Sequence, residues 1–119
     1  MKLSDIVQRG WEAVGSGDFD TLIKDYVEEM TFIMPGQEDV LEGRQSFRAA
    51  LNGLADILPR GFEITGLRQI EGVDEVVSIV EWKSEKVVGS QLAVLFRFKG
   101  EKIFEERWFI DTEQWKSAF

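Results

Sequence analysis

The chain has 119 residues, with 14 Lys and Arg against 22 Asp and Glu and a formal net charge of −8. It contains neither histidine nor cysteine, which excludes Ser-His and Cys-His nucleophilic pairs, thiolate chemistry, disulfides and zinc sites built on His and Cys. The acidic balance argues against nucleic acid and anionic membranes as partners. Asp, Glu, Lys and the single Tyr26 remain for acid–base chemistry.

With 44% hydrophobic residues at this length, we expect a single domain over residues 1–119. The N-terminus has no apolar run of signal-peptide length, and no stretch approaches about 20 apolar residues. We therefore expect no leader and no membrane span, and the cytoplasm is the default location. The sequence has no glycine-rich phosphate-binding motif and no acidic cluster at metal-ligand spacing, so neither a cofactor nor a metal is expected.

The first half of the chain is expected to be helical. Apolar residues recur at helical spacing from Leu3 to Val14, Ser4 is placed to cap the first turn, and the Gly-Ser-Gly of residues 15–17 ends this helix. Asp18 is the expected cap of a second, short helix. The buried side of that helix is expected to comprise Leu22, Ile23, Tyr26 and Val27.

A short strand and a third helix follow. The β-branched and apolar residues 31–34 predict the strand, which Pro35 and Gly36 end. The third helix is expected over residues 44–58, because apolar residues recur there at spacings of three and four. A proline directly after residue 58 blocks its continuation.

The second half changes to alternation typical of strands, expected over residues 62–70, 75–83, 90–99 and 102–111. Short connections favour an antiparallel meander, and helices followed by strands indicate an α+β fold with the helices on one face of a curved sheet. Both faces of these strands carry large apolar residues. We therefore expect a second subunit, and so a homodimer, on the outer sheet face.

Alternation in the last strand places Glu106 on the same face as Phe104, Trp108 and Ile110. If that face lies under the helices, the Glu106 carboxylate points into apolar surroundings, where desolvation raises its pKa toward a value useful for proton transfer. Glu106 is therefore the candidate catalytic acid or base. The alternatives are an outward-turned side chain or a static ion pair with an arginine.

Three segments carry a family pattern: VQRGWEAVGSGDFDTLIKDYVEEMTFIMPG (residues 7–36), LEGRQSFRAAL (residues 41–51) and VLFRFKGEKIFEERWFID (residues 94–111). Their order and spacing resemble the nuclear-transport-factor-2-like superfamily, which includes ketosteroid isomerases and SnoaL-like polyketide cyclases. The resemblance implies a cone-shaped fold with three N-terminal helices packed on a curved, mostly antiparallel sheet. It also implies a homodimer through the open sheet face and a cavity for an apolar small molecule.

The resemblance does not extend to the catalytic residues of the isomerases. The positions of the isomerase Tyr and two Asp correspond here to Gly10, Val94 and Met34, whose side chains neither donate a hydrogen bond to an enolate nor accept a proton. Steroid isomerisation by that mechanism is therefore not expected. Glu106 beside Trp108 resembles the acidic residue next to a tryptophan on the final strand of SnoaL-like members.

The expected ligand-binding residues belong to elements that this fold wraps around its cavity. They are Trp11, Tyr26, Met34, Ser78, Trp82, Val94, Phe96 and Trp108. Their rings suit a flat, largely apolar ligand that the Tyr26 hydroxyl could orient, and ordinary core packing is the alternative. In the family Gln37, Glu38 and Asp39 lie near the entrance, where they either attract a cation or form a solvated loop.

The C-terminal tail keeps Trp115 and Phe119, which we expect to cover a sheet edge or the cavity mouth. Three classes of function remain open: a small enzyme that moves a proton in an apolar cavity, a protein that binds a hydrophobic molecule without turnover, and a dimeric module for protein interaction.

Overall fold

The computed structural model describes residues 1–34 and 40–119. The helices are α1 (Leu3–Ser16), α2 (Phe19–Ile23), α3 (Arg44–Ile57) and α4 (Thr112–Ser117). The strands are β1 (Tyr26–Ile33), β2 (Leu41–Glu42), β3 (Glu63–Glu71), β4 (Glu75–Lys83), β5 (Ser90–Lys99) and β6 (Lys102–Phe109). Within these residues no helix is both long enough and apolar enough to cross a membrane.

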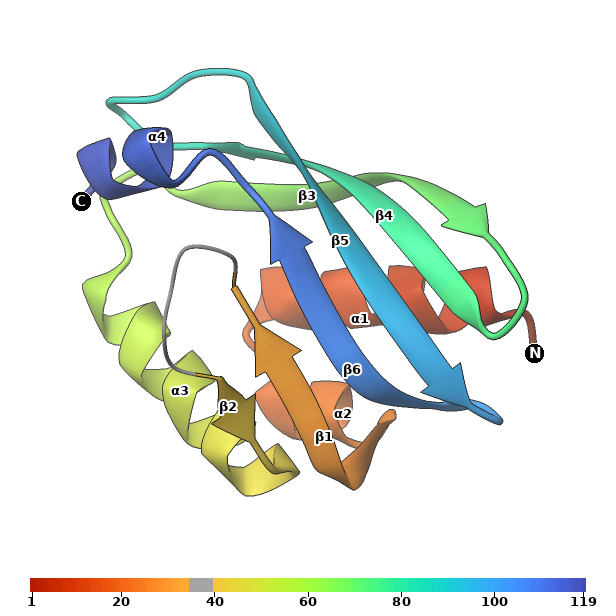
Figure 1. Cartoon of the computed structure of the whole chain (residues 1–119). Helices are drawn as coiled ribbons and strands as arrows, with labels where there is room; N and C mark the ends of the chain where they lie inside the picture. Colours follow the sequence, from red (N-terminus) through yellow and green to blue (C-terminus); the bar gives the residue numbers. More distant parts are fainter. Residues whose placement is uncertain (35–39) are drawn as a thin grey trace.

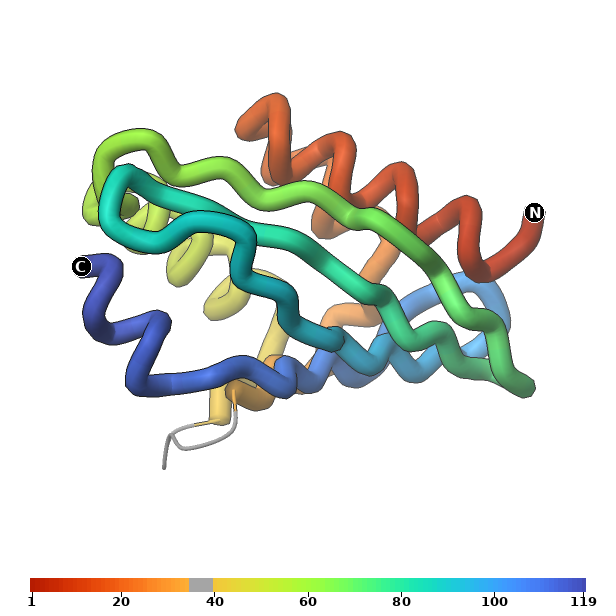
Figure 2. Tube along the Cα trace, turned by 90° about the horizontal axis from the view of Figure 1, so that it is seen from above, coloured from red at the N-terminus to blue at the C-terminus, as the bar shows by residue number. Residues whose placement is uncertain are grey.

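The strands form one curled sheet in the order β2-β1-β6-β5-β4-β3. The meander from β3 to β6 is antiparallel as predicted, and β1 pairs in parallel with β6. Figure 1 shows α1 crossing behind the sheet and α3 standing beside β1 and β2. In the view from above, α1, α2 and α3 lie on the inner side of the curl (Figure 2). The predicted α+β fold, with helices on a curved and mostly antiparallel sheet, is confirmed.

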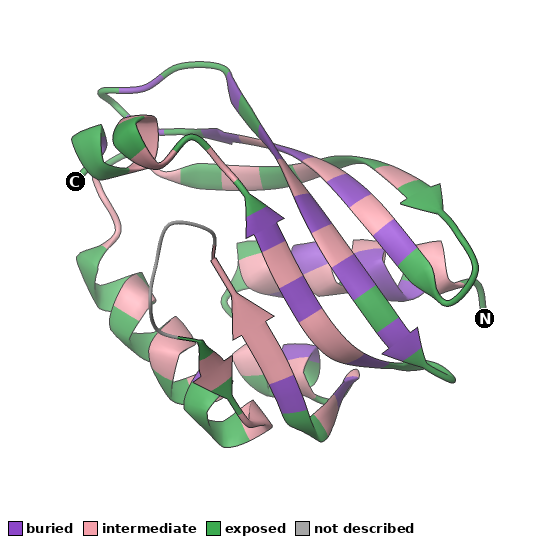
Figure 3. Ribbon diagram, in the orientation of Figure 1, coloured by how far each residue is buried: buried purple, intermediate pink, exposed green. Residues whose placement is uncertain are grey.

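The core lies on the inner face of the sheet. Alternate residues of β4 from Val76 to Trp82 are fully buried, and stripes of buried residues continue across β5 and β6 (Figure 3). Ile6, Val7 and Trp11 bring the apolar side of α1 onto this face. The inner face of the sheet and α1 are therefore closely packed against each other.

The first turn of α1 differs from the sequence prediction. Ser4 lies inside the helix and makes no cap, because the helix begins one residue before it, with Lys2 at the capping position. Instead the Glu71 side chain, from the end of β3, accepts a hydrogen bond from the Ser4 backbone N–H at 2.7 Å. A distant carboxylate therefore satisfies the free amide, as helix N-termini require. At the other end Gly17 adopts φ 74°, as expected for a helix exit.

The second helix is shorter than predicted. It ends at Ile23, and both Tyr26 and Val27 belong to β1. The Asp18 cap is confirmed, since its carboxylate accepts from the Thr21 N–H at 3.2 Å. Tyr26 starts the strand because β1 adds to the edge of β6, where Tyr26 pairs with Ile103. The predicted strand end at residues 35 and 36 lies outside the described residues.

A bulge in β6 changes which side chains share a face. Arg97 pairs with Glu105 but Phe98 pairs with Ile103, so Phe104 has no partner in the register. β6 therefore has one residue more than β5 at this point, which is a β-bulge. Ile103 is buried, whereas the Phe104 ring lies 5.2 Å from the Arg97 guanidinium on the outer face. The prediction that Phe104 and Glu106 share a face is wrong for this reason.

The last strand also ends earlier than predicted, at Phe109, because Asp111 caps α4. Its carboxylate accepts hydrogen bonds from the backbone N–H groups of Glu113 and Gln114, both at 3.1 Å. The helix brings Trp115 against the rings of Trp82 (5.2 Å) and Trp108 (6.5 Å). The tail thus packs across one end of the inner face.

We expect Gly66→Ala to lower the free energy of unfolding by roughly 1–3 kcal/mol, the usual cost of overpacking. A Cβ at Gly66 would lie 2.6 Å from Cδ1 and 2.9 Å from Cγ of Trp11, so the buried indole would have to move. Urea denaturation measures the change. The matched control is Gly53→Ala on α3, which meets nothing within 4 Å. That control should gain up to about 1 kcal/mol. An unchanged stability of Gly66→Ala would contradict this packing.

Candidate functional site

A pocket of about 700 Å³ lies between the helices and the inner face of the sheet. Helix α3 explains why the space is open. Only Phe47 of its apolar stripe is buried, while Leu51, Leu54 and Leu58 stay half-buried and line the pocket. Beyond Phe47, which packs on β1, the stripe therefore faces a hollow in place of the sheet, and the pocket wall is largely apolar.

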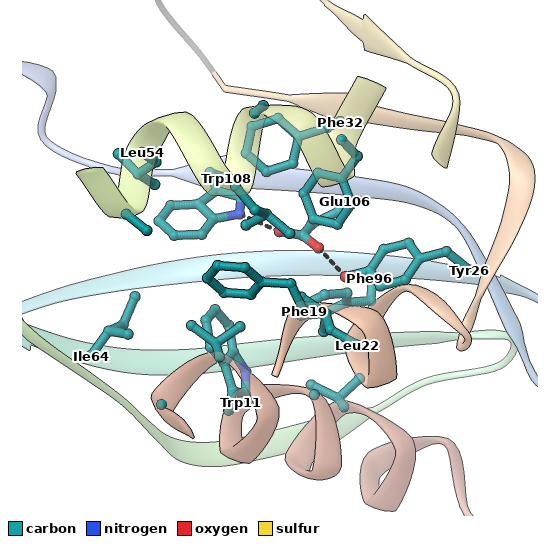
Figure 4. Close-up of a pocket in the computed structure, with 18 of the residues that line it drawn as sticks. Trp11, Phe19, Leu22, Tyr26, Phe32, Leu54, Ile64, Phe96, Glu106 and Trp108 are labelled. Carbon is teal, nitrogen blue, oxygen red and sulfur yellow. Dashed lines mark hydrogen bonds between the residues drawn. The ribbon is translucent and has the colours of Figure 1, made fainter. Parts of the chain in front are cut away.

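Glu106 is the buried carboxylate in this wall. It lies on β6 opposite Phe96 and is 4% exposed. One carboxylate oxygen accepts a hydrogen bond from the indole Nε1 of Trp108 at 2.7 Å, and the other accepts one from the hydroxyl of Tyr26. Figure 4 shows the carboxylate pointing toward Tyr26. Both of its hydrogen-bond donors are thus neutral groups.

Burial controls the protonation of this pair. Desolvation raises the pKa of Glu106 above its ordinary value, and the hydrogen bonds from Tyr26 and Trp108 oppose the rise only in part. Desolvation also raises the pKa of Tyr26 well above its ordinary value, and the neighbouring Glu106 charge adds to the rise. Tyr26 therefore stays a neutral donor, while Glu106 is the group able to change charge.

Trp11 forms a second wall and is held by a chain of polar side chains. Its Nε1 donates to the Ser78 hydroxyl at 2.6 Å, and that hydroxyl donates to Gln69 at 2.6 Å. Gln69 in turn donates to Gln8 at 3.1 Å. The buried hydroxyl thus has both of its partners, and the Trp11 indole is fixed with its ring edge-on to Phe96 at 6.1 Å.

One end of the pocket is aromatic. Trp115 contacts the rings of Phe62 (5.9 Å) and Phe119 (5.1 Å), and both Trp115 and Phe62 line the pocket. Trp82 lies behind them, fully buried, and its indole N–H has no hydrogen-bond partner in the described part of the chain. The α4 segment therefore covers this end of the pocket.

The structure brings together most of the side chains expected to bind a ligand. Those in the pocket wall are Trp11, Tyr26, Met34, Phe96 and Trp108, together with Glu106. Those outside the wall are Ser78, Trp82 and Val94, which are fully buried behind it. The expected loop residues Gln37, Glu38 and Asp39 lie outside the described residues.

Of the positions that correspond to the isomerase catalytic set, Gly10 and Met34 line the pocket and Val94 does not. Sequence reasoning missed several lining aromatics, among them Phe19, Phe32 and Phe47. The apolar stripe of the third helix is the signal for Phe47, whereas Phe19 and Phe32 lie on α2 and β1 and have no signal of this kind. In the described residues no three His, Cys, Asp or Glu side chains gather as a metal site would require.

The fold and this pocket define a class, the nuclear-transport-factor-2-like α+β domains. Within it, the chain belongs to the SnoaL-like domain family, whose model matches residues 7–106. The sequence resemblance is thereby confirmed. A search of the curated proteins found no match.

Solved structures share the fold over nearly the whole chain. Bal32a, from a soil-derived mobile gene cassette, is 22% identical with a TM-score of 0.85, covering 98% of this chain and 95% of that one. An NTF2-like protein of unknown function from Cytophaga hutchinsonii ATCC 33406 is 16% identical with a TM-score of 0.78, covering 98% and 96%. TerC, co-crystallised with polyporic acid, is 13% identical with a TM-score of 0.74, covering 96% and 95%. At these identities the likeness shows the fold alone.

We expect Glu106→Gln to raise the free energy of unfolding near pH 7 by roughly 0.5–2 kcal/mol, the size of a typical stabilising substitution, because it removes a buried charge that has no ion-pair partner. Because folding raises the pKa of Glu106, its contribution to stability is full below the unfolded-state pKa and is lost as pH rises through the folded-state pKa. The amide removes the charge: its oxygen can still accept from the Trp108 N–H, while its NH2 donates to the Tyr26 oxygen, so that the second hydrogen bond reverses its direction. Stability curves of both proteins from acid to neutral pH measure the difference.

The control for this prediction is Glu12→Gln, since Glu12 is exposed on α1. It should change the stability by less than about 0.5 kcal/mol. If Glu106→Gln lost stability as the pH approached neutrality to the same extent as the unmodified protein, the account of the buried charge would be wrong.

Proposed function

We propose that the protein binds a small, largely apolar molecule in this pocket and that Glu106 exchanges a proton with it. One observation carries the proposal: the Glu106 carboxylate, 4% exposed, lies in the wall of an apolar pocket and has no ion-pair partner among the described residues. A buried charge without a partner is costly, so such a group is a candidate functional site.

The geometry suits a general base. Tyr26 and Trp108 hold the carboxylate in one orientation, and each oxygen still has lone pairs beyond the one hydrogen bond that it accepts. The raised pKa brings Glu106 closer to neutrality, where proton transfer in both directions is efficient. A ligand proton placed within hydrogen-bond distance of either oxygen could therefore be taken up and returned.

The family and its solved structures support the binding part of this proposal. TerC, which shares the fold, was crystallised with polyporic acid. The wall of this pocket includes the aromatic rings of Trp11, Phe96 and Trp108, which suit a flat molecule. Gly10 also lines the pocket, next to Leu22.

A second candidate is binding without turnover. It is favoured by the state of the donors around the site: the Tyr26 hydroxyl and the Trp108 N–H are both used by Glu106, and the Trp11 N–H is used by Ser78. None of them is free to stabilise a developing oxyanion, which proton abstraction next to a carbonyl requires. Turnover therefore requires a substrate in which loss of the proton does not place a negative charge on an oxygen that needs a free N–H or O–H donor.

A screen of ring-bearing small molecules by thermal shift tests the binding, because a ligand that binds only the folded state raises the unfolding temperature. For any ligand that is turned over, we expect Glu106→Gln to reduce the rate by about 100-fold or more. Glu12→Gln is the control and should leave the rate unchanged. Full turnover by Glu106→Gln would exclude the proton-transfer role. If the unmodified protein binds ligands but turns none of them over, the second candidate, binding without turnover, is the one supported.

We also propose that two copies of the chain pair through the outer sheet face. Val77, Ile79 and Leu95 lie half-buried on this face, and Phe109 beside them is 51% exposed. Helices α1, α2 and α3 lie on the opposite face of the sheet (Figure 2). A second copy presents the same apolar strip, which is the requirement of a two-fold interface.

Light scattering at micromolar concentration is expected to give the mass of a dimer. Leu95→Glu places a charge in the centre of the strip and should shift the equilibrium to monomer by roughly tenfold or more in dissociation constant. Glu12→Gln serves again as the control. A monomer for the unmodified chain would contradict the proposed pairing.

A further inference from the structure

We propose that the molecule bound in the pocket carries a protonated amine, which Glu106 and the surrounding aromatic rings hold. The inference rests on the proposed function, since it concerns the same pocket, and it names the chemical class of the ligand. Three properties of the wall support it: the hydrogen-bonding capacity of its polar groups, its charges and its ring faces.

The polar groups around Glu106 have spent their donors within the protein and can only accept hydrogen bonds from a ligand. The Trp11 N–H donates to Ser78 at 2.6 Å, the Trp108 N–H donates to Glu106 at 2.7 Å, and the Tyr26 hydroxyl donates to Glu106 as well. What remains are lone pairs on the Glu106 carboxylate and on the Tyr26 oxygen. A ligand that satisfies these groups must therefore bring the donor itself.

The charges of the wall are all negative. The charged residues that line it are Asp25, Glu63 and Glu106; no Lys or Arg lines it among the described residues, and residues 35–39 contain none. Asp25 is paired with Arg9 at 2.6 Å, and Glu63 with Lys83 at 3.2 Å. Glu106 is left as the carboxylate without a cation.

A ligand cation would compensate the Glu106 charge at a site where water does not. An anionic ligand would instead place a second negative charge in the same apolar space, at a large desolvation cost. The chain as a whole has a formal charge of −8, which attracts cations and repels anions during approach. Charge therefore favours an amine over a carboxylate.

Aromatic rings surround the position that the amine would occupy. In Figure 4 the Glu106 carboxylate lies among the rings of Phe19, Phe32, Tyr26 and Trp108, and all four line the pocket. Ring faces attract organic cations through their quadrupole, and the attraction is strongest where water is excluded. A carboxylate within a set of rings is thus an environment suited to an ammonium group attached to an apolar body.

Three probes with the same ring test this inference: 2-naphthylmethylamine, 2-naphthylmethanol and 2-naphthoate, titrated calorimetrically at about pH 8, where an alkylamine is still mostly protonated. We expect the amine to bind roughly tenfold or more tightly than the alcohol, and the carboxylate to bind most weakly. The alcohol is the internal control, because it brings a donor without a charge.

Two variants separate the charge from the shape of the site. Glu106→Gln should remove the preference for the amine while the alcohol still binds. Tyr26→Phe keeps the carboxylate and should retain the preference. If the amine and the alcohol bind equally, or if the carboxylate binds best, the inference is overturned and the proposed binding function stands. If none of the three probes binds at millimolar concentration, both fail.

Discussion

The site depends on one buried charge that is held by neutral groups alone. Glu106 receives two hydrogen bonds, from Tyr26 and Trp108, and has no ion pair in the described part of the chain. Two neutral donors orient a carboxylate but do not replace the hydration that burial removes. The carboxylate is therefore held in place, and a bound group that compensates its charge would lower the free energy of the site.

The rest of the fold serves to keep that charge beside an open space. The sheet and α1 are closely packed, and the Trp11 indole is fixed between Ser78 and Gly66. On the opposite side Phe47 packs α3 onto Tyr26 and Phe32 of β1, while Leu51 and Leu54 farther along the helix line the pocket. The closely packed wall and this part of α3 together enclose the hollow that a fully collapsed core would have filled.

The sequence predicted the architecture well because hydrophobic periodicity and turn residues are local signals. Strands β4 and β5 begin and end where alternation places them, and α3 differs by one residue at its end. The alternation in β6 also placed Glu106 and Trp108 on one face, which the structure retains, since Trp108 donates to Glu106.

The misplaced features depend on contacts between distant segments. The apolar spacing around Tyr26 predicts a helix, whereas the strand that Tyr26 begins forms by pairing with the distant strands β2 and β6. The bulge that turns Phe104 outward is a property of the β5–β6 register, which alternation alone does not encode. Likewise, the apolar residues of α3 look the same whether they face a core or a hollow.

The most direct test of the account is the titration of the Glu106 carboxyl group by ¹³C NMR, with Glu106→Gln used to assign the signal. The account predicts a midpoint above the ordinary range of a glutamate, because desolvation outweighs the two hydrogen bonds. A midpoint at or below that range would contradict it, since the carboxylate would then be hydrated or paired with a cation.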